Sequence, residues 1–321
     1  MTHPNSNIET ILITGGTGFA GSHLVDALLA SGQKNIHVTS YGTETGHVGE
    51  ILPSTQIHPL NLTDFEKTKE LFEKVQPTQI YQLAALASVG SSFDQLDTVL
   101  SANTQIQLSV LSAAQEVCPQ SRILSIGTAL EYKPKETALK ETDVLGPVNP
   151  YGVSKVTQEM LAHSFHRQHN LDVVFTRSFN HFGERQAPGF VVADFSLQVA
   201  KLTRSDSASK EISVGNLAAK RDFTYVKDIA QAYILLMDKG KTGEIYNVGS
   251  GITHSVEEVL QKLISLSGLN IRVTIDEKKF RPIDVPVVLA DIEKIKKLGW
   301  KASTNIDEAL KLTFNYYMNN Y

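Results

Sequence analysis

The stretch Thr10-Ile11-Leu12-Ile13-Thr14-Gly15-Gly16-Thr17-Gly18-Phe19-Ala20-Gly21-Ser22-His23-Leu24 decides the fold. Its apolar start predicts a buried strand over residues 10–14, and leucines at helical spacing predict a helix over residues 22–30. Between them, three glycines form a GxxGxxG spacing. Glycine permits a tight turn, and the free N–H groups at a helix start attract an anion. The sequence therefore predicts a pyrophosphate site between the first strand and the first helix.

The rest of the first half alternates strand and helix patterns. Strands are expected at residues 35–40, 79–83, 122–126 and 172–176, and helices at 65–75, 100–116 and 151–169. Strands separated by helices of ten or more residues form βαβ units, and right-handed crossovers place helices on both faces of a parallel sheet. The fold class is therefore α/β, a Rossmann-type doubly wound sheet.

The texture changes after Ser178, where glycine, proline, asparagine and aromatic residues follow in irregular order. Residues 203–210 are polar and predict a surface loop. Later strands are expected at 223–226, 245–248 and 271–275, and later helices at 255–266 and 291–298. We expect a Rossmann domain of residues 1–177 plus about 223–254, and a smaller substrate lobe of about 178–222 plus 255–321.

Composition excludes several classes of protein. The 321 residues include 30 Lys+Arg and 34 Asp+Glu, so the net charge of −4 offers no basic surface for nucleic acid. Apolar stretches such as Ala232–Met237 fall short of the roughly 18 residues that a membrane span needs. The single cysteine and the polar start without a signal pattern predict a cytoplasmic protein. His163, His166 and His169 lack acidic or cysteine partners, so no metal site is predicted.

A candidate catalytic group lies at the start of the helix predicted over residues 151–169. Tyr151 and Lys155 have the YxxxK spacing, which puts both on one helix face. An ammonium beside a phenol lowers the phenol's pKa, and such a tyrosine can exchange a proton with a sugar hydroxyl or keto oxygen. The preceding strand leads to Thr128, whose hydroxyl can bond the same oxygen. We predict the catalytic trio Thr128, Tyr151 and Lys155.

This combination resembles the extended short-chain dehydrogenase/reductase superfamily that acts on nucleotide sugars, over essentially the whole chain. The resemblance implies an NAD(P) cofactor and hydride transfer. Expected cofactor contacts are Gly15, Thr17, Gly18, Phe19, Gly21, Ser40, Asn61, Leu62, Leu83, Ala84, Ala85, Asn103, Tyr151 and Lys155. The end of the second strand, residues 38–43, holds neither the acid typical of NAD sites nor the Arg typical of NADP sites, so the choice stays open.

The second half is similar to two branches, the GDP-mannose 4,6-dehydratases and the GDP-4-keto-6-deoxymannose reductases. The similarity lies in residues 177–183, 189–195, 215–223 and 281–286. It implies that Arg221 and Arg281 grip the substrate's diphosphate through forked hydrogen bonds. The expected substrate contacts are Asn180, Arg185, Val191, Arg221 and Arg281. It also implies a homodimer, with the helices at 100–116 and 151–169 pairing in a four-helix bundle.

One departure separates the branches. The dehydratases follow the reactive threonine with an acid pair or Ser-Glu, whereas Thr128 is followed by Ala129 and Leu130, which transfer no proton. Glu131 comes one place later, and a strand-like exit turns it to the opposite face. The sequence thus predicts a reductase of an NDP-4-keto-6-deoxyhexose, GDP-linked by resemblance. Three alternatives remain. The first is a 4,6-dehydratase in which a different backbone path after Thr128 brings Glu131 into the site. The others are a C4 epimerase and a catalytically silent nucleotide-binding module.

Overall fold

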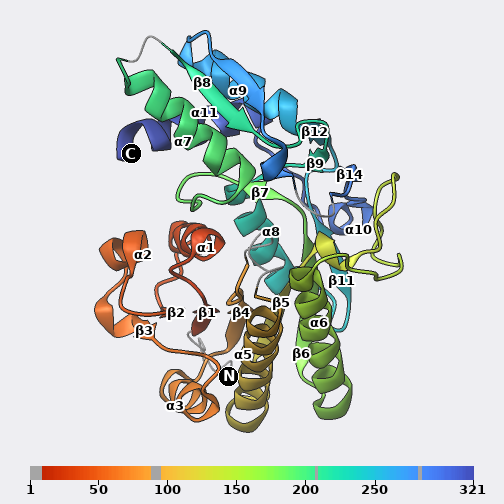
Figure 1. The fold of residues 1–321 in the computed structure, drawn as a ribbon. Coiled ribbons are helices and arrows are strands. Elements are labelled where there is room, and N and C mark those ends of the chain that lie inside the picture. The colour runs from red at the N-terminus through yellow and green to blue at the C-terminus, as the bar shows by residue number, and fades with distance from the viewer. Residues whose placement is uncertain (1–8, 88–94, 207–208, 281–283) are drawn as a thin grey trace.

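The computed structural model describes residues 9–87, 95–206, 209–280 and 284–321. Within these residues, parallel strands form a seven-stranded sheet in the order β11-β6-β5-β4-β1-β2-β3 (Figure 1). Their bounds are β1 (Ile11–Thr14), β2 (Ile36–Ser40), β3 (Ile57–Pro59), β4 (Gln79–Gln82), β5 (Arg122–Thr128), β6 (Asp172–Ser178) and β11 (Ile245–Val248). The predicted Rossmann-type sheet is confirmed. The strand order reverses between β1 and β4, which opens a crevice at the carboxyl ends of these strands.

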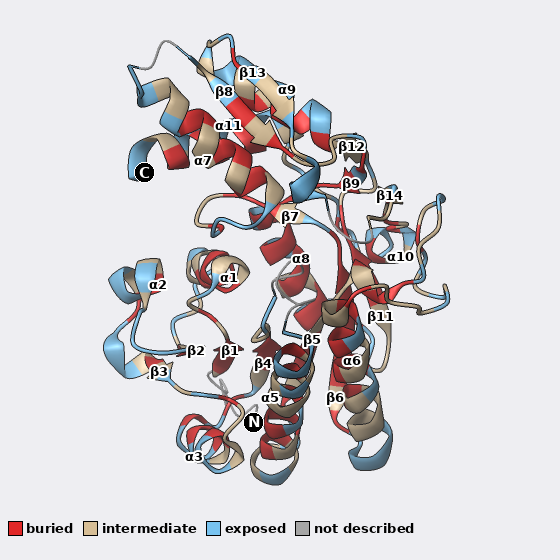
Figure 2. Cartoon of the chain, in the orientation of Figure 1, coloured by how far each residue is buried: buried red, intermediate tan, exposed pale blue. Residues whose placement is uncertain are grey.

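Helices cover both faces of this sheet. One face carries α1 (Phe19–Ala30) and α8 (Val226–Lys239), with α2 (Gly46–Ile51) beside α1, and the other carries α3 (Phe65–Val75), α5 (Leu96–Val117) and α6 (Pro150–His169). Alternate strand residues supply the two cores: Ile11 and Ile13 pack toward α1 and α8, whereas Leu12 packs toward α3 and α5. The buried sides of the helices face the sheet (Figure 2).

A smaller lobe covers the carboxyl ends of the strands. Its core lies between α7 (Val191–Arg204), α9 (Val256–Ser267) and α11 (Ile306–Asn320). Short strands complete it, paired as β8 (Glu211–Val214) with β13 (Arg272–Ile275), β7 (His181–Phe182) with β10 (Thr224–Tyr225), and β9 (Lys220–Asp222) between β12 (Thr253–Ser255) and β14 (Val287–Val288). The remaining elements are α10 (Glu293–Lys296) and the 3-10 turns η1 (Ser54–Gln56), η2 (Ala129–Glu131) and η3 (Glu277–Lys279).

Several element boundaries differ from the sequence-based expectations. Residues 191–204, expected to be irregular with a loop from 203, form α7 because Val192, Phe195 and Val199 bury one helix face. The strand expected at 223–226 is shorter and ends at Tyr225, and α8 begins at Val226. In the described residues no helix combines the length and apolarity needed to cross a membrane.

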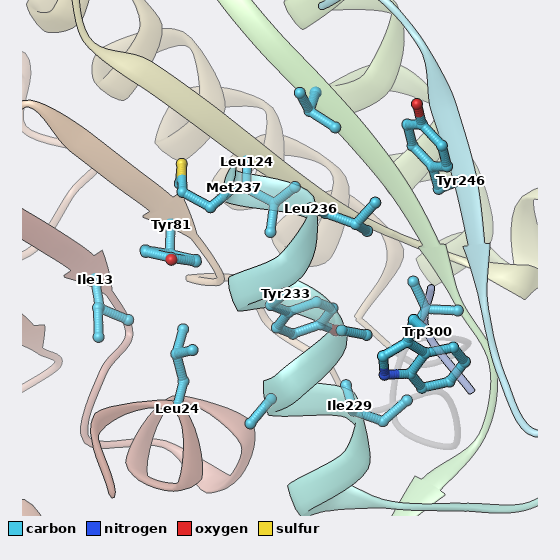
Figure 3. Packing of buried hydrophobic residues seen from close by; sticks show 14 of the residues in the cluster. Ile13, Leu24, Tyr81, Leu124, Ile229, Tyr233, Leu236, Met237, Tyr246 and Trp300 are labelled. Carbon is cyan, nitrogen blue, oxygen red and sulfur yellow. The ribbon is translucent and has the colours of Figure 1, made fainter. Parts of the chain in front are cut away.

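Part of the C-terminal segment packs on the sheet rather than on the lobe. Trp300 lies in the core beside α8, with Ile229 and Tyr233 (Figure 3). Its indole N–H donates to the carbonyl of Asp228 at 3.2 Å. The division into residues 1–177 plus 223–254 and 178–222 plus 255–321 stays a prediction, and Trp300, expected in the lobe, packs on the sheet side.

Candidate active site

A cavity of about 540 Å³ lies between the sheet and the lobe, at the crevice between β1 and β4. It brings together residues that are far apart in the sequence. The predicted site residues in its lining are Gly15, Thr17, Gly18, Phe19, Gly21, Leu83, Ala84, Ala85, Thr128, Tyr151, Lys155, Asn180, Val191 and Arg221. Ligands of doubly wound folds bind at this position.

The glycine-rich turn has the shape that a dinucleotide's pyrophosphate requires. The N–H of Gly18 donates to the carbonyl of Gly15 at 3.0 Å, and a Cβ on Gly21 would collide with that carbonyl. No side chain caps the start of α1, and its first turn holds no acid. The helix N–H groups and the positive helix end therefore remain available to an anion in the cavity. These residues fit a nicotinamide dinucleotide.

The loop after β4 forms the other wall of this turn. The hydroxyl oxygen of Thr14 accepts from the backbone N–H groups of Leu83 and Ala84, each at 3.1 Å. Behind the loop, Asn103 accepts from the N–H of Leu86 at 2.7 Å and donates to Oγ of Ser154 at 2.9 Å. Asn103 is fully buried and outside the cavity lining, so it joins the loop to α6.

Other predicted cofactor contacts also lie outside the cavity lining. Ser40 donates to the carbonyl of Gly42 at 3.0 Å, and its neighbour Tyr41 lines the cavity instead. Asn61 accepts from the N–H of Thr63 at 3.2 Å in the turn before α3, and Leu62 is buried in the core. The structure does not bring Ser40, Asn61 and Leu62 to the cavity as expected, because local turn bonds and core packing engage them.

Arg185 pairs with Asp26 of α1, Nη2 to Oδ2 at 2.7 Å, and does not line the cavity. The structure thus places Arg185 outside the cavity lining, because an ion pair holds its guanidinium against α1. Arg281 lies outside the described residues.

The predicted catalytic side chains converge from two elements. Thr128 ends β5, and Tyr151 lies in the first turn of α6, which Asn149 caps by accepting from the N–H of Gly152 at 2.8 Å. Lys155 follows one turn later, and its Nζ donates to Oε1 of Gln158 at 2.7 Å. The hydroxyl, the phenol and the ammonium thus border one space, as proton transfer to a bound oxygen requires.

The electrostatics of the phenol differ from the expectation that Lys155 lowers its pKa. Burial raises the pKa of Tyr151 above its ordinary value. Burial likewise lowers the pKa of Lys155 to about 8. Desolvation of the buried phenol is the largest influence on its pKa. Tyr151 is therefore protonated at neutral pH and prepared to donate its proton.

The residues after Thr128 form a tight turn that decides which side chains enter the cavity. Ala129 and Leu130 line it. Glu131 folds back beneath the turn, where it is fully buried, and its Oε1 accepts from the N–H of Thr128 at 2.6 Å. Glu131 does not line the cavity. Hence the described lining holds no carboxyl group immediately beyond Thr128.

A cationic group marks the lobe side of the cavity. Nη2 of Arg221, on β9, donates to Oδ1 of Asp284 at 2.6 Å, and Nδ2 of Asn216 donates to the other carboxylate oxygen at 2.7 Å. Arg221 and Asp284 both line the cavity. Asn180 follows β6 and is exposed toward the same space. Nη1 of Arg221 donates to the carbonyl of Lys220 at 2.8 Å, so both ends of the guanidinium fork are engaged and a substrate phosphate would compete with Asp284 for it.

Sequence reasoning missed some cavity residues. Tyr41, Ser178, Tyr233, Phe190 and Asp284 were not selected. The hydroxyls of Ser178 and Tyr233 bond each other at 2.8 Å. The apolar residues of α8 recur at helical spacing, which was the available signal that Tyr233 faces inward.

Comparison with known proteins gives one family. The model of the GDP-mannose 4,6 dehydratase family matches residues 12–313. The human GDP-mannose 4,6 dehydratase is 30% identical, over 94% of this chain and 89% of that protein. The UDP-glucose 4-epimerase of Lacticaseibacillus casei is 28% identical, over 97% of each.

Solved structures agree with this result. The UDP-glucose 4-epimerase of Thermus thermophilus in complex with NAD has a TM-score of 0.86 at 27% identity, covering 97% of this chain and all of that one. RMD from Pseudomonas aeruginosa complexed with NADPH has a TM-score of 0.85 at 25% identity, covering 98% and 100%. The expected nicotinamide dinucleotide cofactor is thereby supported. The chain belongs to the GDP-mannose 4,6 dehydratase family, among the NAD(P)-dependent extended short-chain dehydrogenases/reductases.

Proposed function

We propose that this enzyme reduces the C4 keto group of a nucleotide-linked 4-keto-6-deoxyhexose. One observation carries the proposal. The cavity unites Thr128, Tyr151 and Lys155 with a dinucleotide-shaped turn, while the two positions after Thr128 present Ala129 and Leu130. Reduction needs hydride and proton transfer, for which these groups suffice. Elimination of water also needs an acid or base near the C5–C6 bond, and the described lining offers no carboxyl group there.

Each side chain has a definite task in this reaction. The glycine-rich turn at Gly15, Gly18 and Gly21 would hold a nicotinamide dinucleotide, which would supply the hydride for C4. Tyr151 donates its phenolic proton to the carbonyl oxygen, which becomes a hydroxyl, and Thr128 donates a hydrogen bond to the same oxygen. Lys155, with a pKa of about 8, is mainly charged at neutral pH and stabilises the phenolate that remains. Solvent then returns a proton to Tyr151.

The substrate proposal rests on the lobe. The diphosphate fits Arg221, and Asn180 is placed to contact the phosphate or sugar. The family match and the 30% identity to the human GDP-mannose 4,6 dehydratase favour GDP as the nucleotide. We further propose that the enzyme is a homodimer in which α5 and α6 form a four-helix bundle with their counterparts. These two helices pack against each other on one face of the sheet.

A C4 epimerase is the second candidate. Epimerisation uses the same hydride and proton transfers, and it too needs no acid beyond Thr128. The 28% identity to the Lacticaseibacillus casei UDP-glucose 4-epimerase supports this candidate. The burial of Glu131 outside the cavity lining speaks against a dehydratase that recruits it. The two candidates differ in whether the reduced dinucleotide is consumed.

The test offers purified enzyme three substrates. GDP-4-keto-6-deoxymannose is supplied with NADPH and, separately, with NADH, and consumption of the reduced dinucleotide is followed by absorbance. UDP-glucose and GDP-mannose are supplied without added reduced dinucleotide. Oxidation of either dinucleotide by the keto sugar supports the reductase. Conversion of UDP-glucose to its C4 epimer supports the epimerase. Loss of water from GDP-mannose would show a dehydratase and would contradict the claim that Glu131 takes no part in the reaction.

A further inference from the structure

The position of Glu131 is unusual for a carboxyl group. Its side chain has no exposed surface, and Oε1 accepts from the N–H of Thr128 at 2.6 Å. The other oxygen, Oε2, has no hydrogen-bond donor among the described residues. The nearest cationic atom is Nε of Arg177 at 3.7 Å, beyond hydrogen-bond distance. A buried carboxylate oxygen left without a donor is strongly disfavoured.

Arg177 is engaged by a different carboxylate. Its Nε donates to Oε2 of Glu159 at 2.9 Å and its Nη2 to Oε1 of Glu159 at 2.7 Å, while Nη1 donates to the carbonyl of Glu141 at 3.1 Å. The guanidinium of Arg177 therefore neutralises the charge of the Glu159 carboxylate. Glu131 faces the same Glu159, and the two carboxyl groups are within reach of a shared hydrogen bond. Two neighbouring buried carboxyl groups do not both ionise readily.

Lys155 is the other cation that acts on Glu131, and in the described structure it forms no hydrogen bond with Glu131. The charged and titratable groups that act on Glu131 or feel it are Glu159 and Lys155 from α6, Arg177 from β6, Tyr151 and Tyr132. The ammonium of Lys155 donates to Gln158. Burial and the charge of Glu159 raise the pKa of Glu131 well above its usual range.

We propose that Glu131 is a positioning residue, held as a neutral carboxylic acid that donates its proton to Glu159, accepts from the N–H of Thr128 and fixes that threonine at the edge of the cavity. Glu131 takes no part in proton transfer to the sugar. The role of Thr128 rests on the proposed function, whereas the protonation state of Glu131 does not.

The backbone around Glu131 is adapted to this contact. A Cβ on Gly127 would collide with Oε1 of Glu131 and with the carbonyl of Thr176, so the absence of a side chain there leaves room for the carboxyl group. Thr128 and Glu131 form a reciprocal capping box across the turn η2. The same turn presents Ala129 and Leu130 to the cavity. One buried acid thus sets the direction of the turn.

The test compares two substitutions with a matched control. Glu131→Gln keeps the acceptor for Thr128 and a donor for Glu159, so kcat is expected within about threefold of wild type with an unchanged pH profile. Glu131→Ala removes both bonds, so kcat is expected to fall about 100-fold while KM stays within about threefold. Glu136→Gln, an exposed glutamate in the same segment, is the control. Loss of activity in Glu131→Gln as severe as in Glu131→Ala would overturn the proposal, and so would full kcat in a folded Glu131→Ala.

An infrared difference spectrum needs no turnover. Wild type minus Glu131→Gln is expected to show the carbonyl stretch of a protonated carboxylic acid at pH 7, and a carboxylate band in its place would contradict the neutral state. This measurement decides the question even if Glu131→Ala does not fold. If wild type does not reduce the keto sugar, the proposed function fails, and the kinetic comparison is made on the sugar nucleotide reaction that wild type performs.

Discussion

Nζ of Lys155 donates to Oε1 of Gln158 at 2.7 Å, and Nε2 of Gln158 in turn donates to the carbonyl of Asn103 at 2.7 Å. The side-chain amide of Gln158, itself bonded to Asn103 of α5, therefore holds the ammonium in place. A buried charge fixed in this way needs little rearrangement when a ligand arrives. Because Lys155 is buried, its pKa is lowered, and the pH dependence of the rate measures this effect.

We predict that kcat/KM falls as pH rises through about 8. Burial lowers the pKa of Lys155 from its ordinary 10.5 to about 8, so the positive charge is present below that pH and is lost above it. Without the charge, the phenolate of Tyr151 is less stable, and the rate is expected to fall about tenfold per pH unit. Lys155→Arg keeps a charge at all these pH values and should abolish the decrease of kcat/KM above pH 8. If the decrease persists unchanged in Lys155→Arg, a group other than Lys155 causes it.

Tyr151→Phe is expected to lower kcat by about 10²–10⁴-fold, because it removes the proton donor. The dissociation constant for the reduced dinucleotide, measured by fluorescence titration, should stay within about threefold of wild type. Tyr321→Phe, an exposed tyrosine at the C-terminus, serves as the control and should leave both quantities unchanged. Full activity in Tyr151→Phe would show that another group donates the proton.

Arg221→Ala should weaken substrate binding with a smaller effect on kcat. Losing charge-assisted hydrogen bonds to a diphosphate costs about 1.5–3 kcal/mol, so KM for the nucleotide sugar is expected to rise about 10- to 100-fold. The neighbouring exposed Lys220 gives the matched control, Lys220→Ala, for which KM should not change. Equal changes in both variants would point to a general effect of charge.

Arg185→Ala tests the ion pair that the structure assigns to this residue. Because Arg185 binds Asp26 and lies outside the cavity lining, KM for the nucleotide sugar should stay within about twofold of wild type. The free energy of unfolding, measured with urea, should fall by up to about 1 kcal/mol, as is typical of a partly exposed pair. A large rise in KM at unchanged stability would restore Arg185 to the substrate site.

The sheet was predictable from the sequence because its signals are local. Apolar strands such as Ile11–Thr14 and helices such as Phe65–Val75 can be recognised in the sequence from their hydrophobic periodicity and their capping residues. In α7 the same periodicity was present, but the surrounding glycines and prolines concealed it. The packing of Trp300 against α8 depends on a long-range contact that no local pattern reveals.

The candidate site divides in the same way. The glycine turn and the YxxxK helix are compact motifs, and the structure brings Gly15, Tyr151 and Lys155 to one cavity. The direction of Glu131 was left open, because a tight turn and a straight strand exit place residue 131 on different sides. Likewise, Asp26 engages Arg185 from 159 positions away in the chain, a contact beyond the range of any motif.

The most direct test of the central claim is the fate of labelled hydride. Reduced dinucleotide carrying deuterium at the transferred position is incubated with GDP-4-keto-6-deoxymannose, and the sugar is analysed by NMR and mass spectrometry. We predict one deuterium at C4 of the product for each dinucleotide oxidised. Product without deuterium at C4, or a sugar that changes while the label stays on the dinucleotide, would contradict the reductase assignment.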